Sequence, residues 1–362
     1  MNVATIRTAK AAALLGAILV LASAAAAAMW WAHARHGATG ATGGADRTDS
    51  AASPTDPDAP PVDPALRRFV ELGSFLVGLD APRGLAVDPA GRILVAGDSK
   101  LRAFDSGGRQ IEVASFDLAF EPKCLAVGRA GEAGEPRIYV ASNDRVDVFD
   151  QQGHRRDTWQ SFGPKAAITS IAVDALGEHD VYVADAGNRV VWRLAPDGTR
   201  RGEIGRPDPN RRILGFIITS EYFDVVCAPD GLIYAVNPRA LRVEAYTPRG
   251  DLEGQWGRGS PEIGGFFGCC NPAHLAVLSD GRFVTAEKGI PRVKLFTPRG
   301  ELLAVVADES ELKTTPADLA VDAEDHILLL DPATRQVRTF VARAAEPPLE
   351  TGPRTGDTGR LR

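Results

Sequence analysis

A short apolar triplet recurs six times along this 362-residue chain, and this repeat constrains the fold more than any other feature. Successive triplets start about 40 to 54 residues apart. They are Leu85-Ala86-Val87, Leu125-Ala126-Val127, Ile171-Ala172-Val173, Val225-Val226-Cys227, Leu275-Ala276-Val277 and Leu319-Ala320-Val321. A period of this size is typical of the four-stranded blade of a β-propeller. The sequence therefore predicts an all-β fold, a six-bladed β-propeller.

Each triplet is followed by a turn, a second apolar run that ends in a polar residue, and a third strand. The polar ends are Asp98, Asn143, Asp185, Asn237, Glu287 and Asp331. The predicted third strands are 101–105, 145–150, 189–194, 241–247, 292–297 and 336–341. Turns that combine proline with glycine, such as Pro196-Asp197-Gly198, then lead to the fourth strands.

The sixth repeat has no fourth strand of its own, because Glu346-Pro347-Pro348 follows its third strand. The segment 67–75, before the first triplet, resembles the outer strand at 155–162. An N-terminal strand that completes the last blade would close the ring and remove exposed sheet edges. We therefore expect 67–75 to be the outer strand of blade six.

The third repeat carries Tyr182-Val183-Ala184-Asp185-Ala186-Gly187-Asn188-Arg189-Val190, and this stretch resembles an NHL repeat. The resemblance covers all six blades, about residues 66 to 342, but only blade three matches closely, and blades two and four diverge most. It implies that Asp185 and Arg189 brace their own blade. It leaves function open, because related propellers include ligand binders, protein-interaction modules, lyases and lactonases.

Residues 1–36 predict a membrane segment. Arg7 and Lys10 precede an uncharged stretch at 11–32, which as a helix would be about 33 Å long, enough to cross a bilayer. Trp30 and Trp31 stand at its far end, as in an interfacial aromatic belt. A cleaved signal peptide is the alternative, since Ala22-Ser23-Ala24 is an acceptable cleavage site.

The positive charge on the N-terminal side predicts a single-pass protein of the cell membrane, anchored through residues 11–32. The C-terminal propeller would then lie on the extracytoplasmic, periplasmic side. Residues 37–64 are rich in Gly, Ala, Thr, Ser, Asp and Pro and predict a disordered linker. The propeller is expected at 65–343, and 344–362 is expected to be a disordered tail.

The composition excludes several classes of function. The net charge is -6 and no Lys/Arg block stands out, which argues against nucleic-acid binding. Four cysteines are too few for a disulfide scaffold. The chain has no G-x-S-x-G, H-E-x-x-H, phosphate-loop or C-x-x-C motif, so no reaction can be read from its motifs and an enzyme is not favoured.

In a propeller of this type, the residue before each triplet lies near the mouth of the central channel. These residues are Gly84, Cys124, Ser170, Asp224, His274 and Asp318. Asp224, His274 and Asp318 come from successive blades and together could hold a divalent metal. NHL-like lyases bind metal there chiefly with histidines, whereas this ring has a single histidine. The alternative is a hydrated channel that binds only water.

The pair Cys269-Cys270 lies in the loop that leads to His274. Three interpretations stay open: a strained vicinal disulfide, a copper site shared with His274, or two thiols that only pack the loop. Cys227 and Cys124 are most simply buried apolar thiols.

Aromatic residues are expected around the same mouth. An apolar insertion at 214–223 includes Tyr222 and Phe223, and Phe266 and Phe267 precede the cysteine pair. Together with Cys269, Cys270 and His274 they form the predicted ligand-binding set. The alternative is that the insertion is a lid that packs onto its own blade.

Three functions follow from these features. The first is a tethered module that binds a protein or a small molecule. The second is a redox or copper-handling accessory protein that uses Cys269 and Cys270. The third is a metal-dependent propeller lyase or lactonase.

Overall fold

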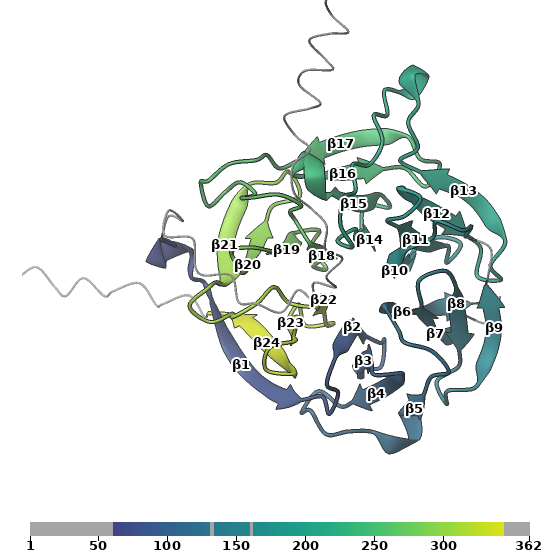
Figure 1. The fold of residues 1–362 in the computed structure, drawn as a ribbon. Helices are drawn as coiled ribbons and strands as arrows, with labels where there is room; N and C mark the ends of the chain where they lie inside the picture. Colours follow the sequence, from purple (N-terminus) through teal and green to yellow (C-terminus); the bar gives the residue numbers. More distant parts are fainter. Residues whose placement is uncertain (1–60, 131–133, 160–161, 344–362) are drawn as a thin grey trace, which may run out of the picture. The chain divides into compact units, whose positions relative to one another are not determined.

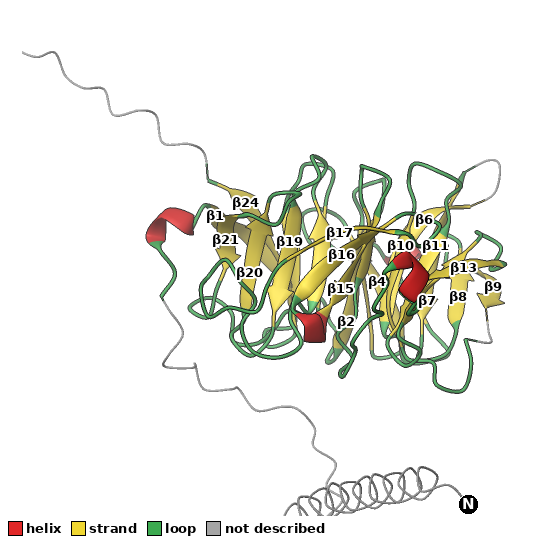
Figure 2. Cartoon of the chain, turned by 90° about the horizontal axis from the view of Figure 1, so that it is seen from above, coloured by secondary structure: helices red, strands yellow, loops and turns green. Residues whose placement is uncertain are grey.

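The computed structural model describes residues 61–130, 134–159 and 162–343. In this part of the chain, six antiparallel sheets of four strands each surround a central channel, as predicted (Figure 1). Figure 2 shows the ring from the side, with the connecting loops gathered at its two faces. The sheets are β2–β5, β6–β9, β10–β13, β14–β17, β18–β21, and β22–β24 completed by β1.

The strands of each blade run from the channel outward. The inner strands are β2 (Pro82–Val87), β6 (Cys124–Ala130), β10 (Ile168–Val173), β14 (Val225–Cys227), β18 (His274–Val277) and β22 (Asp318–Val321). The second strands are β3 (Ile93–Gly97), β7 (Glu135–Ala141), β11 (Val181–Asp185), β15 (Ile233–Asn237), β19 (Phe283–Glu287) and β23 (Ile327–Asp331).

The third and fourth strands form the outer half of each blade. The third strands are β4 (Lys100–Phe104), β8 (Val146–Phe149), β12 (Val190–Leu194), β16 (Arg242–Tyr246), β20 (Arg292–Phe296) and β24 (Gln336–Ala342). The outer strands are β5 (Phe116–Asp117), β9 (Arg155–Trp159), β13 (Arg200–Ile204), β17 (Leu252–Trp256), β21 (Leu302–Ala307) and β1 (Phe69–Leu76). The described 3-10 turns are η1 (Pro64–Leu66), η2 (Glu112–Ala114), η3 (Pro209–Arg211) and η4 (Pro238–Ala240).

The second strands have continuous apolar sequences because both of their faces are covered by neighbouring blades. Every residue of β3, β11, β15, β19 and β23 is buried. Outer strands face solvent, and three of the five residues of β9 are exposed. Packing between blades therefore forms the core. Leu85 of blade one, for example, lies in one cluster with Leu330 and Val337 of blade six.

The ring closes through β1, as the sequence predicted. β1 pairs antiparallel with β24, from Phe69 opposite Ala342 to Leu76 opposite Gln336. In Figure 1 the purple first strand lies along the outer edge of the yellow last strand. Strands far apart in the sequence thus complete one sheet.

The polar residue predicted to end each second strand was placed one position late in two blades. The strand register places Gly97 and Ser142 where Asp185, Asn237, Glu287 and Asp331 stand in the other blades. Asp98, which has a positive φ of 50°, still accepts hydrogen bonds from Asp80 N and Ala81 N in the loop that enters its blade.

The bracing of blade three follows the NHL expectation in part. Asp185 accepts hydrogen bonds from Ala167 N, Asn188 Nδ2 and Trp192 Nε1. Arg189 is an exposed turn residue with φ 57°, and the bracing that the structure records comes from Asn188 and Trp192.

The predicted membrane segment at 11–32 and the tail at 344–362 lie outside the described residues, as does the linker up to residue 60. Within the described residues, no helix has the length and apolar character needed to span a membrane. Burial begins at Val62, which is 7% exposed.

Candidate functional site: the channel mouth

The six predicted mouth residues occupy one equivalent place in the six blades. Each lies opposite an equivalent residue near the end of the second strand of its blade. The pairs are Gly84 with Ala96, Cys124 with Ala141, Ser170 with Ala184, Asp224 with Val236, His274 with Ala286 and Asp318 with Leu330. Because the inner strands surround the channel, these positions form a ring at one of its ends.

Asp224, His274 and Asp318 come together in this ring, although nearly 100 residues separate the first from the last. One carboxylate oxygen from each aspartate and one imidazole nitrogen all lie within 4.8 Å of one another. His274 Nδ1 is 3.6 Å from Asp224 Oδ2. Asp224 is buried, whereas His274 and Asp318 are partly exposed. Two carboxylates and an imidazole are a donor set that suits a divalent cation.

Backbone amides hold the Asp224 carboxylate in place. Asp224 accepts hydrogen bonds from Val225 N at 2.8 Å and from Leu275 N of the next blade at 2.8 Å. Ser170 Oγ, in the preceding blade, donates a third at 2.5 Å. Asp224 therefore links three blades.

Asp318 plays a similar part between blades six and one. Its carboxylate accepts from its neighbour Leu319 N and from Leu85 N, each at 2.8 Å. Both carboxylates are thus oriented by the fold. Asp224 Oδ1 accepts two of these hydrogen bonds, whereas Asp224 Oδ2 and both Asp318 oxygens accept one each and keep a lone pair for a further ligand.

Burial and mutual repulsion shape the protonation of the cluster. Burial raises the pKa of Asp318 to about 7, with His274 opposing the shift and the nearby charge of Asp224 adding to it. Burial alone would lower the pKa of His274, but the Asp224 carboxylate, together with Asp318 and Glu221, raises it above its ordinary value. At neutral pH the cluster therefore readily holds a proton, which a cation would displace.

Two of the remaining mouth residues, Gly84 and Cys124, provide no charged ligand atom. Gly84 has no room for a side chain, since a Cβ there would lie 2.8 Å from Leu125 Cδ2 and 3.0 Å from Leu125 N. Cys124 is buried, and burial followed by the charges of Asp318 and Asp224 raises its pKa well above the ordinary value. It is a neutral thiol facing the carboxylates, in line with the predicted apolar role.

Tyr222 lies beside His274 at the mouth, and Lys288 lies beside Tyr222. The Tyr222 ring meets the His274 ring edge-on, with centroids 6.0 Å apart. Lys288 Nζ lies 4.8 Å from the centroid of the Tyr222 ring. Sequence analysis missed Lys288, although the repeat could have placed it. Lys288 follows Glu287, the polar end of a second strand, at the end of the channel where Asp224 and His274 lie.

Two of the predicted aromatic residues are core side chains. Phe223 and Phe266 are each 1% exposed, and both belong to the large core cluster of blades three to five. Phe223 packs on Phe216 at a centroid distance of 4.8 Å. Tyr222 and Phe267 are the partly exposed aromatic members of the predicted set.

The insertion in blade four packs largely onto its own blade. Ile213, Phe216 and Ile218 are each 4% exposed and join the same core cluster. Leu214 and Ile217 point outward and are 81% and 48% exposed. This pattern matches the lid alternative for most of the segment and leaves Tyr222, at its end, for the mouth.

Cys269 and Cys270 are both free thiols with different surroundings. Cys269 is exposed and Cys270 is buried. Cys270 Sγ lies 3.2 Å from Thr219 Oγ1 in the blade-four insertion. Burial would raise the pKa of Cys270, but hydrogen bonds with Thr219, Ser220 and Cys269 and the charge of Lys288 lower it overall.

The structure does not favour the copper interpretation. Among the described residues, two groups bring three or more metal-ligating atoms within 4.8 Å: the mouth cluster and the turn residues Asp322, Glu324 and His326. Neither group contains a cysteine, so Cys269 and Cys270 do not assemble with His274 as a site.

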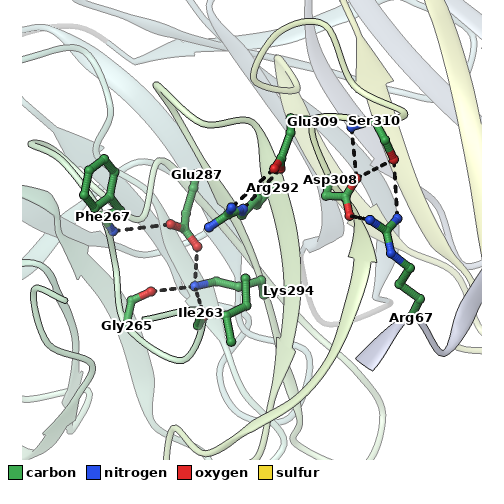
Figure 3. A network of polar contacts seen from close by, with 10 residues as sticks. All are labelled: Arg67, Ile263, Gly265, Phe267, Glu287, Arg292, Lys294, Asp308, Glu309 and Ser310. Atoms are coloured by element: carbon green, nitrogen blue, oxygen red, sulfur yellow. Dashed lines mark hydrogen bonds and ion pairs between the residues drawn. The ribbon is translucent and has the colours of Figure 1, made fainter. Parts of the chain in front are cut away.

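A buried ion pair fixes the loop that carries the cysteines. Lys294 of β20 pairs with Glu287 of β19, and Lys294 Nζ also donates to the carbonyls of Ile263 and Gly265 at 2.9 and 2.6 Å (Figure 3). Asn271 then holds the far end of the loop through Lys288 N and O. The loop around the mouth is therefore anchored at both ends.

Comparisons with known proteins support the architecture. No family model matches the chain, and no curated protein does so either. A streptogramin B lyase structure is similar over 78% of this chain and 100% of its own, with 13% identity and a TM-score of 0.52. A protein of unknown function from Bacteroides thetaiotaomicron is similar over 76% of this chain and 72% of its own, with 16% identity and the same TM-score. At these identities the likeness shows the propeller fold alone.

Proposed function

We propose that this protein is an NHL-type binding module, tethered to the outer face of a membrane by residues 11–32, whose channel mouth binds its ligand through a divalent cation. The observation that carries the proposal is the cluster of Asp224, His274 and Asp318. Three consecutive blades supply the donors, and the backbone amides of neighbouring blades orient both carboxylates.

The surroundings of the cluster suit a ligand better than a bare structural ion. Tyr222 borders His274, Lys288 lies over the Tyr222 ring, and the exposed Cys269 belongs to the adjoining loop. An aromatic face beside a fixed positive charge would contact an anionic or polar group of a ligand bound to the cation. The tether and linker expected before residue 65 would present this face to a soluble or membrane-bound partner.

The test is metal content together with stability. The full-length protein, purified without chelator, should contain about one divalent cation per chain, or gain thermal stability when Zn²⁺, Mn²⁺, Ca²⁺ or Mg²⁺ is added, since binding to the native state stabilises it. His274→Ala should abolish the response, and His326→Ala, which disrupts the other candidate group in the turn at Asp322, should preserve it. A stability unchanged by all four cations in protein free of metal would refute the cation site.

A metal-dependent lyase or lactonase is a second candidate. It is favoured by one observation: His274 and Asp318 are partly exposed, so a substrate oxygen could reach a cation held by the cluster and be polarised by it. Cation-dependent acid release from simple lactones or esters that is lost in His274→Ala would establish it. Cation binding without such turnover would rule out this enzyme and favour the binding module.

A further inference from the structure

A hollow lies at the end of the channel opposite the mouth, and its lining residues differ from those of the mouth. Its volume is about 300 Å³, at the lower end of the range for small-molecule sites. Residues that follow the inner strands of blades three to six line it. It therefore shares strands β10, β14, β18 and β22 with the mouth but opens at their opposite ends.

The floor of the hollow is apolar. Cys227, Val277 and Val321, the last residues of β14, β18 and β22, all line it and are partly buried. Leu176, on the adjoining turn of blade three, also lines the hollow and is 67% exposed. A large apolar side chain in that position exposes surface that an apolar ligand would cover.

The rim of the hollow carries negative charge. Asp174 accepts from Leu176 N and Gly177 N, and Asp325 accepts from Ser279 N and Oγ. These donors orient the two carboxylates but are neutral. Among the described residues, the structure records no ion pair between either carboxylate and a basic side chain.

Three basic side chains near this rim already have contacts of their own. Asp322, the third rim carboxylate, pairs with the imidazole of His326 at 2.8 Å. The His179 imidazole contacts the backbone carbonyl of Asp174 at 3.1 Å. Arg282, in the turn of blade five, is paired with Asp280. An apolar hollow bordered by two uncompensated carboxylates repels anions and attracts cations.

We propose that this hollow is a binding site for a small amphipathic cation, an alkylammonium or guanidinium group on an apolar body. The apolar body would lie over Cys227, Val277 and Val321, and the charge would lie between Asp174 and Asp325. This site is independent of the proposed function, because its residues and its end of the channel are different.

Cys227 provides a direct reporter in the full-length native chain. Two methanethiosulfonate reagents of similar size, one carrying a trimethylammonium group and one a sulfonate, each transfer a thioalkyl group to a thiolate and release methanesulfinate. Peptide mass spectrometry follows each cysteine separately. Burial, then the charges of Asp174 and Asp180, raise the pKa of Cys227, so the reaction is run at alkaline pH with both reagents.

The cationic reagent should modify Cys227 at least about tenfold faster than the anionic one. The exposed Cys269, on the mouth side, is the internal control and should show a smaller preference. Asp174→Asn combined with Asp325→Asn keeps the oxygen acceptors of both turns and should reduce the ratio at Cys227 to that at Cys269. A thermal unfolding midpoint close to that of the unmodified protein would show that the variant folds.

Protection provides a second measurement that needs no variant. Butyltrimethylammonium should slow the modification of Cys227 and leave Cys269 unaffected, whereas butanesulfonate should protect neither. Equal rates for the two reagents at Cys227, or no protection by butyltrimethylammonium, would overturn the proposal. So would a Cys227 that reacts with neither reagent, since the hollow would then be closed to molecules of this size.

Discussion

The carboxylate of Asp318, in blade six, accepts a hydrogen bond from the backbone N–H of Leu85, in blade one, at 2.8 Å. The contact joins the last inner strand to the first, across 233 residues of sequence. Asp224 makes the same kind of bond to Leu275 between blades four and five. The two acidic residues proposed as metal ligands therefore also link neighbouring blades by hydrogen bonds. Their replacement should affect both the stability of the fold and cation binding.

Asp318→Ala should lower the free energy of unfolding by about 2 kcal/mol or more, because the N–H groups of Leu85 and Leu319 lose their acceptor at a partly buried site. Urea unfolding near pH 6 measures the loss, and Glu253→Ala, on an exposed outer strand, is the control. Asp318→Asn should lose less, since an amide oxygen still accepts. If the free energy of unfolding falls no more than in Glu253→Ala, the contact between Asp318 and Leu85 does not stabilise the closed ring.

The stability of the metal-free protein should fall as the pH rises from about 5 to about 8. The pKa of Asp318 is raised in the folded state to about 7, so the folded protein binds this proton more tightly than the unfolded chain does. The corresponding stability is complete below the unfolded pKa and is lost as the pH passes through the folded value. The raised pKa of His274 acts in the same direction.

Urea unfolding in the presence of chelator, at a series of pH values, measures this slope. Asp318→Asn should flatten it, because the group that titrates has been removed. A stability that rises over this interval, or a slope unchanged in Asp318→Asn, would show that the cluster does not share a proton in this way.

Most of the architecture could be predicted because each blade repeats one local pattern. The predicted third strands differ from the observed ones by one residue at most at either end, as with 241–247 and β16 (Arg242–Tyr246). The closing strand was predictable because blade six lacked a partner for its third strand. Asp98 and Asn143, the predicted polar ends of two second strands, were placed one position late. A single sequence does not show which turn contains one residue more than the equivalent turns of the other blades.

The candidate site was predictable only in its outline. The repeat predicts which residue of each blade lies at the channel mouth, so the proximity of Asp224, His274 and Asp318 could be predicted from the sequence. Burial could not be judged in the same way: Phe223 and Phe266 resemble Tyr222 in sequence, but the packing of an insertion decides which aromatic side chain faces outward. The partner of Glu287 was also missed. Lys294 stands opposite Thr285, and its burial becomes clear only once Glu287 is known to lie diagonally across from it on the paired strand.

Removal of residues 1–76 should open the ring, whereas removal of residues 1–60 should leave the propeller intact. Without β1, the strand β24 becomes an exposed edge, and Arg338 loses Glu71, its partner at 2.6 Å. We expect the shorter protein to aggregate or to unfold at a clearly lower temperature, as measured by size-exclusion chromatography and circular dichroism. Two truncated proteins of equal stability would show that β1 is dispensable for closure.

Lys294→Met should destabilise the protein by about 3 to 5 kcal/mol, because it leaves the buried Glu287 carboxylate without its partner. Burial raises the pKa of Glu287, and with Lys294 present that cation opposes the shift. A Glu287→Gln, Lys294→Met double variant should regain part of the loss, since no buried charge then remains unpaired. Chemical unfolding of the two single variants and the double variant gives the coupling energy directly.

The same substitution should also loosen the channel mouth, which separates this ion pair from an ordinary core contact. Lys294 holds the carbonyls of Ile263 and Gly265, and the loop that begins there leads to Cys269 and His274. We expect faster hydrogen exchange at 258–270 and faster modification of the buried Cys270 thiol in Lys294→Met than in Val284→Ala, a core control in the same blade. If exchange in this loop is equal in the two variants, the pair stabilises blade five without positioning the mouth.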